Sequence, residues 1–298
     1  MDANMQLPKR KKEPTELEHG ILSWVNKDAL EDPIKHADIA AYDYRSKAFD
    51  LTNPPRVSTR DKESLAPILA LPKDAYILEL GGGDGRFGHA IMEEGFTHVI
   101  ESDISLQSVT FAAQVAQRKN LKGIFAVIDS EHLPFDDNSL DAAYMVASLH
   151  HVPSAERVLN EMHRVLKPGG MIAILREPAS WQYYVFYPAF KAIRWIVRRN
   201  DHTPHSLADD TTFGFTERFF KRQLAGTFRD INTVPVHYTR KLYTNFIDLL
   251  NKLFRLTIRY NPRVESHCIK LDTQIARIPG LRSLTWDWDV YAIKKEVG

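Results

Sequence analysis

The sequence is poor in cysteine, since Cys268 is its single cysteine among 298 residues. One cysteine excludes an intramolecular disulfide and a cysteine-rich metal site, and it fits a reducing compartment. Long apolar runs are missing too, because none approaches the ~20 residues that span a bilayer. Met1–Glu18 is polar and lacks the apolar stretch of a signal peptide. We therefore expect a cytoplasmic protein.

The sequence also lacks an excess of charge of either sign. Its 39 Lys and Arg residues face 38 Asp and Glu residues, which gives a formal charge of +1. Because a dedicated nucleic-acid binder usually has a clear basic excess, we expect no nucleic-acid partner. We interpret the basic cluster Lys9–Lys12 as part of a frayed, solvated tail. The length allows one large domain or two ordinary ones.

Apolar strands alternate with helices between residues 75 and 178. Helices are expected from Ser105 to Lys119 and from a Ser154 cap to Leu166. This alternation predicts an α/β fold with a doubly wound, mostly parallel sheet. The expected strands are Tyr76–Leu80, His98–Glu101, Gly123–Ile128, Leu140–Ala147 and Met171–Leu175.

A different pattern follows Pro178. Trp181–Arg199 reads as an aromatic helix, and a polar loop follows it. Tyr238–Tyr260 is predicted to be a long amphipathic helix that continues irregularly to about Arg282. Asp230–Val236 and Trp286–Lys294 are predicted to be strands.

A glycine-rich turn connects the first of these strands to a helix. Gly81, Gly83 and Gly85 let the backbone approach a ligand closely and leave the N–H groups of the helix free. Residues 83–88 satisfy the dinucleotide fingerprint G-x-G-x-x-G. Counted from Glu79, the same turn is an acidic-x-Gly-x-Gly-x-Gly pattern. The glycine spacing alone leaves both interpretations open.

The acidic pattern resembles the first motif of the class I S-adenosylmethionine-dependent methyltransferases. Four later segments resemble motifs of this family in the same order: residues 101–105, 128–136, 140–152 and 164–170. The resemblance spans about residues 75–178. It implies a Rossmann-like fold with a helical cap, a transferase activity and S-adenosyl-L-methionine as the cofactor.

The resemblance also implies a division of the chain and a set of donor contacts. Asp103 would hold the ribose hydroxyls, and the residues after strand 123–128 would contact the adenine. The implied parts are a tail and helical lid (1–60), the donor-binding core (61–178), cap inserts (179–215 and 237–283) and the rest of the core sheet (216–236 and 284–298). The implied donor-binding residues are Glu79, Gly81, Gly83, Gly85, Asp103, Ile104, Asp129, Ser130 and Val146.

An NAD(P)-dependent oxidoreductase of Rossmann type is the alternative. Tyr187 and Lys191 match the Tyr-x-x-x-Lys pattern of short-chain reductases, but they lie in the aromatic insert, so we interpret the match as chance. A nucleic-acid methyltransferase is disfavoured because the Asn-Pro-Pro segment at 53–55 precedes the first strand of the sheet, and Cys268 lies far from the sheet motifs. A non-catalytic relative is disfavoured by the intact Glu79 and Asp103.

Methyl transfer to an oxygen requires a base if the acceptor must lose a proton. Ligands of open α/β sheets bind at the carboxyl ends of the strands. His151 and His150, after the fourth strand, are therefore our first candidates for the base, and Glu177 is the second. The resemblance implies a lid helix over the donor, which we place at Ile39–Phe49; its aromatic rings either lie near the sulfonium or pack the lid on the core. Its candidate rings are Tyr42, Tyr44 and Phe49.

The aromatic insert suggests the kind of acceptor. Aromatic walls suit a hydroxylated small molecule such as a sugar, a glycan or a natural-product intermediate. Arg194, Arg198 and Arg199 make the same helix basic, so a lipid-linked acceptor at the membrane surface ranks second. We do not expect membrane contact. We interpret the His and Asp residues of the next loop as solvated and expect no metal. They are His202, His205, Asp209 and Asp210.

Overall fold

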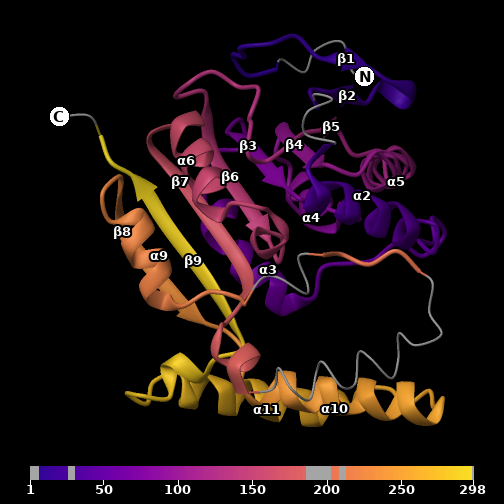
Figure 1. Cartoon of the computed structure of the whole chain (residues 1–298), viewed down its shortest axis with the longest axis vertical. Coiled ribbons are helices and arrows are strands. Elements are labelled where there is room, and N and C mark those ends of the chain that lie inside the picture. The colour runs from indigo at the N-terminus through magenta and orange to yellow at the C-terminus, as the bar shows by residue number, and fades with distance from the viewer. Residues whose placement is uncertain (1–6, 26–30, 186–202, 208–212, 297–298) are drawn as a thin grey trace.

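The computed structural model describes residues 7–25, 31–185, 203–207 and 213–296. In this part of the chain a nine-stranded sheet has the order β1-β2-β5-β4-β3-β6-β7-β9-β8 (Figure 1). Its strands are β1 Thr15–Glu16, β2 Leu22–Ser23, β3 Tyr76–Leu80, β4 His98–Asp103, β5 Ile124–Val127, β6 Leu140–Val146, β7 Leu166–Pro178, β8 Phe228–Pro235 and β9 Asp287–Lys294.

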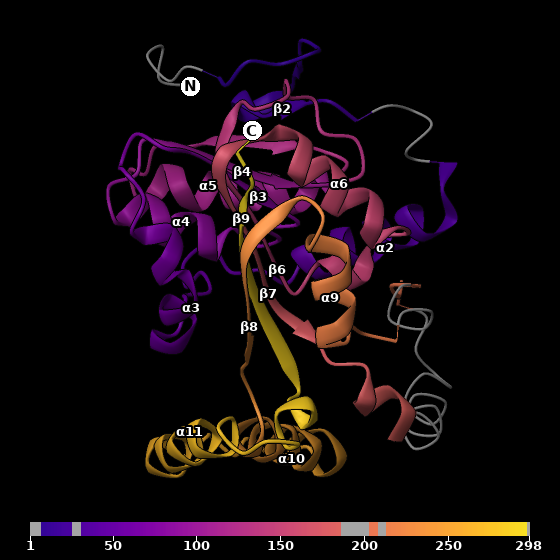
Figure 2. The same cartoon turned by 90° about the vertical axis from the view of Figure 1, so that its left-hand side faces the viewer.

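The helices cover both faces of this sheet (Figure 2). The α-helices are α2 Pro33–Ser46, α3 Thr59–Leu69, α4 Arg86–Glu93, α5 Leu106–Arg118, α6 Ala155–Val165, α9 Glu217–Leu224, α10 Thr239–Phe254 and α11 Pro262–Ile275. Short 3-10 helices are η1 Glu18–Gly20, η2 Leu149–His151 and η3 Arg282–Leu284. Apolar side chains of α3 and α4 pack on one face of the sheet, and those of α6 and α9 pack on the other.

The centre of the sheet is parallel. Strands β2, β5, β4, β3, β6 and β7 run in one direction. Their apolar residues are buried on both faces, as expected of a covered parallel sheet; Ile77 and Leu78 of β3 have no exposed surface. The α/β, doubly wound fold predicted from the sequence is therefore confirmed.

Two antiparallel pairings complete one side of the sheet. β9 pairs antiparallel with β7, and β8 pairs antiparallel with β9. It follows that β8 runs in the same direction as β7 and ends at the same edge of the sheet. The helices α10 and α11, which connect β8 to β9, are therefore attached at the carboxyl edge of the parallel strands.

Three sequence-based expectations need correction. The N-terminal segment is not a frayed tail from residue 7 onward, because β1 and β2 extend the sheet beside β5 and Trp24 is buried. Helix α2 begins at Pro33 rather than Ile39, since Asp32 caps it by accepting the N–H groups of residues 34 and 35. The segment after Tyr260 forms the regular helix α11, which Asn261 caps and Pro262 starts.

The aromatic insert is only partly described. Residues 181–185 are helical, and the Trp181 ring packs edge-on against that of Trp286. The rest of the predicted helix to Arg199, including Tyr187, Lys191, Arg194 and Arg198, lies outside the described residues. Across the described ranges, no helix combines the length and the apolar character that crossing a membrane requires.

Candidate active site

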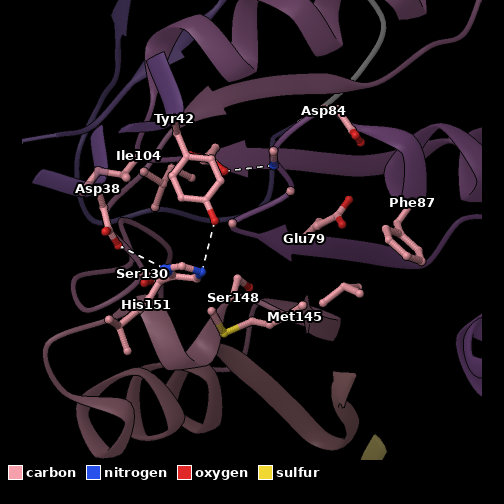
Figure 3. Close-up of a pocket in the computed structure, with 18 of the residues that line it drawn as sticks. Asp38, Tyr42, Glu79, Asp84, Phe87, Ile104, Ser130, Met145, Ser148 and His151 are labelled. Carbon is pink, nitrogen blue, oxygen red and sulfur yellow. Dashed lines mark hydrogen bonds and ion pairs between the residues drawn. The ribbon is translucent and has the colours of Figure 1, made fainter. Parts of the chain in front are cut away.

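A pocket lies at the carboxyl edge of the sheet, where β3, β4 and β6 end and α2 crosses them (Figure 3). The glycine turn after β3 forms one wall. Gly81 and Gly83 have φ angles of +66° and +59°, in the left-handed region that favours glycine. A Cβ atom on Gly81 would stand 2.7 Å from that of Ser148. The turn therefore needs glycine both for its conformation and for its contact with the end of β6.

Most residues that the sequence predicts as donor contacts line this pocket. The exception is Gly85, which is the N-cap residue of α4 with φ +76° and lies against Ala112 and His89. The lining residues among them are Glu79, Gly81, Gly83, Asp103, Ile104, Asp129, Ser130 and Val146. The structure thus brings these residues together, while their contacts with a donor stay predictions.

Asp103 ends β4 beside the glycine turn. One carboxylate oxygen accepts the N–H of Gly83 at 2.9 Å and the other accepts the N–H of Ser105 at 2.8 Å. Burial raises the pKa of Asp103, and these backbone hydrogen bonds oppose the increase. The carboxylate is thereby held at the pocket wall, where it is able to accept hydrogen bonds from a pair of ribose hydroxyls.

A pair of buried carboxyl groups supports the turn from below. Glu79 and Glu101 are paired in register on β3 and β4, and each is 1% exposed. The Tyr144 hydroxyl donates to Glu79 at 2.8 Å. A Cβ atom on Gly82 would lie 1.9 Å from one oxygen of Glu101, so the turn rests directly on this side chain. Burial and the neighbouring Glu79 charge raise the pKa of Glu101 well above its usual range.

The helix α2 covers the pocket and is anchored by a buried ion pair. The Nζ atom of Lys35 lies 2.8 Å from Asp129 and 2.6 Å from Glu131. Burial opposes ionisation of Asp129, but the hydrogen bonds from Lys35 and His132 outweigh it and lower the pKa of this carboxyl. Because breaking a buried ion pair leaves an uncompensated charge, the contact fixes the start of α2 over the predicted adenine side of the pocket.

His151 projects from η2 into the pocket and faces this helix (Figure 3). Its Nε2 atom lies 3.1 Å from the Tyr42 hydroxyl. Its Nδ1 atom lies 3.2 Å from the Ser206 hydroxyl and 3.5 Å from one carboxylate oxygen of Asp38. The other oxygen of Asp38 is buried without a hydrogen-bond partner among the described residues. Both ring nitrogens of His151 are thus oriented by groups at the pocket.

The other two predicted base candidates lie behind His151. Glu177 is fully buried and accepts the backbone N–H groups of Ser148, Leu149 and His150 at 2.8 to 3.1 Å. It also lies 2.9 Å from Nδ1 of His150. Neither residue is among those that line the pocket. The hydrogen bonds of Glu177 hold η2 in place. Because His151 lines the pocket, the geometry favours His151 over Glu177 and His150 as the group that contacts an acceptor.

Of the three aromatic residues predicted on the lid, two line the pocket and one does not. Tyr42 and Phe49 line the pocket. Tyr44 does not, and it is 47% exposed. Phe87 of α4 is a further lining ring that the sequence analysis did not select.

The sequence analysis missed Lys35, Asp38 and Glu101. Lys35, Asp38 and Tyr42 follow the i, i+3, i+7 spacing of one helical face, and this periodicity was the available signal. Glu101 carries no such signal, because a single acidic residue within an apolar strand does not reveal its partner.

The charges of the residues that line the pocket distinguish between the two candidate cofactors, S-adenosylmethionine and a nicotinamide dinucleotide. Five carboxylates line the pocket, against the cations Lys35 and Arg86. Lys35 is paired with Asp129 and Glu131, and Arg86 lies 3.6 Å from Asp84. An acidic pocket attracts the sulfonium and ammonium of S-adenosylmethionine and repels the pyrophosphate of a nicotinamide dinucleotide. The residues present therefore fit the methyl donor.

Residues 203–207 of the histidine-rich loop are described, whereas His202, Asp209 and Asp210 lie outside the described residues. His205 is described, and its Nε2 atom is buried without a hydrogen-bond partner among the described residues. In the described ranges, no three His, Cys, Asp or Glu side chains are grouped so that they could hold a metal ion.

Comparisons with known proteins agree with this geometry. Residues 78–174 match the family described as a methyltransferase domain. Sterol 24-C-methyltransferase erg6 of Schizosaccharomyces pombe is 28% identical over 50% of this chain and 40% of its own length. The ubiquinone/menaquinone biosynthesis C-methyltransferase UbiE of Bartonella tribocorum is 32% identical over 38% of this chain and 46% of its own length. This chain thus spans less than half the length of these two relatives.

Among solved structures, phosphoethanolamine N-methyltransferase 2 of Haemonchus contortus in complex with S-adenosyl-L-methionine has a similar fold. The TM-score is 0.55 at 14% identity, over 92% of this chain and 61% of that one. The fold, the acidic pocket and the family match agree. Residues 78–174 therefore match a methyltransferase domain, the sheet has the Rossmann-like fold of the class I methyltransferases, and S-adenosyl-L-methionine is the cofactor that these findings support.

We expect Asp103→Ala to weaken binding of S-adenosylhomocysteine by roughly 1–3 kcal/mol, because ribose hydroxyls would lose a charged acceptor. Titration calorimetry measures this loss. Glu63→Ala, which removes an exposed carboxylate of α3, is the matched control and should leave the affinity unchanged. An Asp103→Ala protein of normal affinity would limit Asp103 to organising the turn.

We expect Glu101→Gln to flatten the pH dependence of stability. A carboxyl whose pKa is raised by folding stabilises the protein below its unfolded pKa and loses that contribution as pH rises through the folded pKa. The free energy of unfolding of the original protein should therefore fall above about pH 4.5, by up to about 1.4 kcal/mol per pH unit. Urea unfolding between pH 5 and 8 measures the slope. Glu63→Gln should keep the original slope, and the same slope in Glu101→Gln would contradict the assignment.

Proposed function

We propose that the protein transfers the methyl group of S-adenosylmethionine to a hydroxyl oxygen of a small molecule. The observation that carries this proposal is His151, which lies in the donor pocket with both ring nitrogens oriented by neighbouring side chains. A general base of this kind is needed for a hydroxyl acceptor, whereas a fully activated nucleophile needs only proximity.

The polar groups around His151 indicate which of its ring nitrogens accepts the proton of the acceptor hydroxyl. Asp38 is able to accept a hydrogen bond, so Nδ1 is the ring nitrogen that donates toward it. Nε2 is then the basic nitrogen, and Tyr42 donates to it at 3.1 Å. An acceptor hydroxyl that takes the place of the Tyr42 hydroxyl loses its proton directly to Nε2. An acceptor hydroxyl that donates to Tyr42 gives its proton to the Tyr42 oxygen, while the Tyr42 proton moves to Nε2. The buried Asp38 stabilises the imidazolium that forms.

The remaining pocket residues bind and orient. When bound, S-adenosylmethionine supplies a methyl group already activated on a sulfonium. Asp103 and the glycine turn would hold the donor, and Ile104 and Ile128 offer apolar surface for the adenine. The lid helix α2 excludes water from this side of the pocket. Chemistry in such a site depends on placing the two reactants in line and keeping them dry.

The aromatic lining supports an acceptor with a flat or apolar part. Tyr42, Phe49 and Phe87 supply rings, and Met145 adds an adaptable apolar surface. A hydroxylated natural-product intermediate fits this lining. A sugar is also compatible, since aromatic rings stack on sugar faces.

Methylation at carbon is the second candidate. The two relatives are named as C-methyltransferases of a sterol and of ubiquinone/menaquinone biosynthesis, so a carbon of a hydroxylated acceptor is the second candidate for the atom that accepts the methyl group. His151 would remove the same proton in that reaction. Fragmentation of the product by mass spectrometry distinguishes the two outcomes, because an O-methyl ether and a C-methyl group break differently.

A matched pair of histidine variants tests the base. With any hydroxylated acceptor that turns over, we expect His151→Ala to lower kcat by ~10²-fold and to leave S-adenosylhomocysteine affinity intact. His150→Ala removes a neighbouring ring that does not line the pocket, so it should keep kcat within a few-fold. Methyl transfer from radiolabelled donor measures both. Full turnover by His151→Ala across pH would show that the reaction depends on proximity alone.

A further inference from the structure

The helices α10 and α11 form an antiparallel hairpin at one end of the molecule (Figures 1 and 2). Asp272 of α11 accepts the N–H and hydroxyl of Thr239 at 2.7 Å, and Arg240 binds Glu265. Tyr243 accepts the N–H of Asn261 at the far end. The two helices are therefore well joined to each other, so the hairpin presents a defined surface.

The outward side of α10 is apolar, which is the reverse of an ordinary surface helix. Leu242, Phe246, Leu249 and Leu253 follow an i, i+4, i+7, i+11 spacing, so they form one stripe along the helix. Phe246 is 57% exposed and Leu253 is 60% exposed. Ile247, on the opposite side, is buried. A contiguous stripe of this kind marks an interaction surface.

Exposed apolar residues also occur at the tip of the hairpin and on α11. All described side chains at the tip, from Leu253 to Tyr260, are exposed. On α11 Val264 and Leu271, seven residues apart, are exposed apolar residues. The apolar tip residues are Leu253, Phe254, Leu256, Ile258 and Tyr260.

Basic residues lie among these apolar ones. Residues 238–284 contain nine Lys and Arg against three Asp and Glu, whereas the whole chain has 39 against 38. Most of the basic excess of this segment is solvent-facing. The exposed basic residues for which no ion pair with a described residue is found are Arg255, Arg259, Arg263, Lys270 and Arg277.

We propose that the α10–α11 hairpin docks the protein onto an anionic lipid bilayer. Helices with an apolar face and Lys and Arg beside it lie in the membrane interface, where the apolar side chains enter the acyl boundary and the cations meet lipid phosphates. A second copy of the chain is the poorer occupant of this surface, because an isologous contact would bring two hairpins of the same positive charge together.

The topology places this surface on the side of the acceptor. The hairpin follows β8, which ends at the same edge of the sheet as β7, and the donor pocket lies at the carboxyl edge of the parallel strands. The docking itself does not depend on the proposed reaction. The proposal departs from the sequence analysis, which did not expect membrane contact and ranked a lipid-linked acceptor second.

Vesicle flotation of the full chain tests the proposal. We expect binding to vesicles of phosphatidylcholine with phosphatidylglycerol, little binding to phosphatidylcholine alone, and weaker binding as salt rises. Arg263→Glu with Lys270→Glu should lower the partition by about tenfold or more. Phe246→Ser with Leu253→Ser should do the same, because it removes the apolar side chains that would enter the acyl boundary.

The control is Arg218→Glu with Arg222→Glu, which makes the same change of charge on exposed positions of α9. This variant should bind like the original protein. Unchanged thermal unfolding of all the variants confirms that the substitutions act on the surface. Equal loss in the control and the hairpin variants would overturn the proposal, as would no binding to the anionic vesicles. A homodimer by light scattering that Phe246→Ser with Leu253→Ser dissociates would also overturn it.

Discussion

Several carboxylates lie at the edge of the sheet where the parallel strands end. The architecture of the pocket depends on how the negative charge of each one is compensated. Asp103 and Glu177 are compensated by backbone N–H groups of the turns that follow the strands. Asp129 is compensated by Lys35. Glu101 is compensated by its own proton, since its pKa is raised well above the usual range. A buried charge without such a partner would cost several kcal/mol, roughly the whole net stability of a marginal domain.

The contacts that compensate the charges of Glu177 and Asp129 also fix the positions of other residues of the pocket. The N–H groups that Glu177 accepts fix η2, and His151 ends that short helix. The ion pair of Lys35 fixes the start of α2, so Asp38 and Tyr42 follow one and two turns later on the same helical face. His151 therefore lies beside Asp38 and Tyr42. The contacts of two carboxylates, Glu177 and Asp129, hold the two elements that carry these residues.

The sequence predicted the parts of the site that are local. The glycine turn, the acidic end of β4 and the histidines after β6 all lie within a few residues of a strand end, where the pattern of apolar residues locates them. Lys35 and Glu101 could not be predicted in this way, because their partners are distant in sequence or on a neighbouring strand. The packing of residues 7–25 was missed for the same reason, since β2 is only two residues long and depends on β5 for its pairing.

The identity of the donor is the central claim, and titration calorimetry of the full chain tests it most directly. The acidic lining of the pocket and the position of Asp103 beside the glycine turn predict that S-adenosylmethionine and S-adenosylhomocysteine bind with one site per chain. They predict no binding of NAD(H) or NADP(H). Binding of a nicotinamide dinucleotide with no binding of either S-adenosyl ligand would contradict the account.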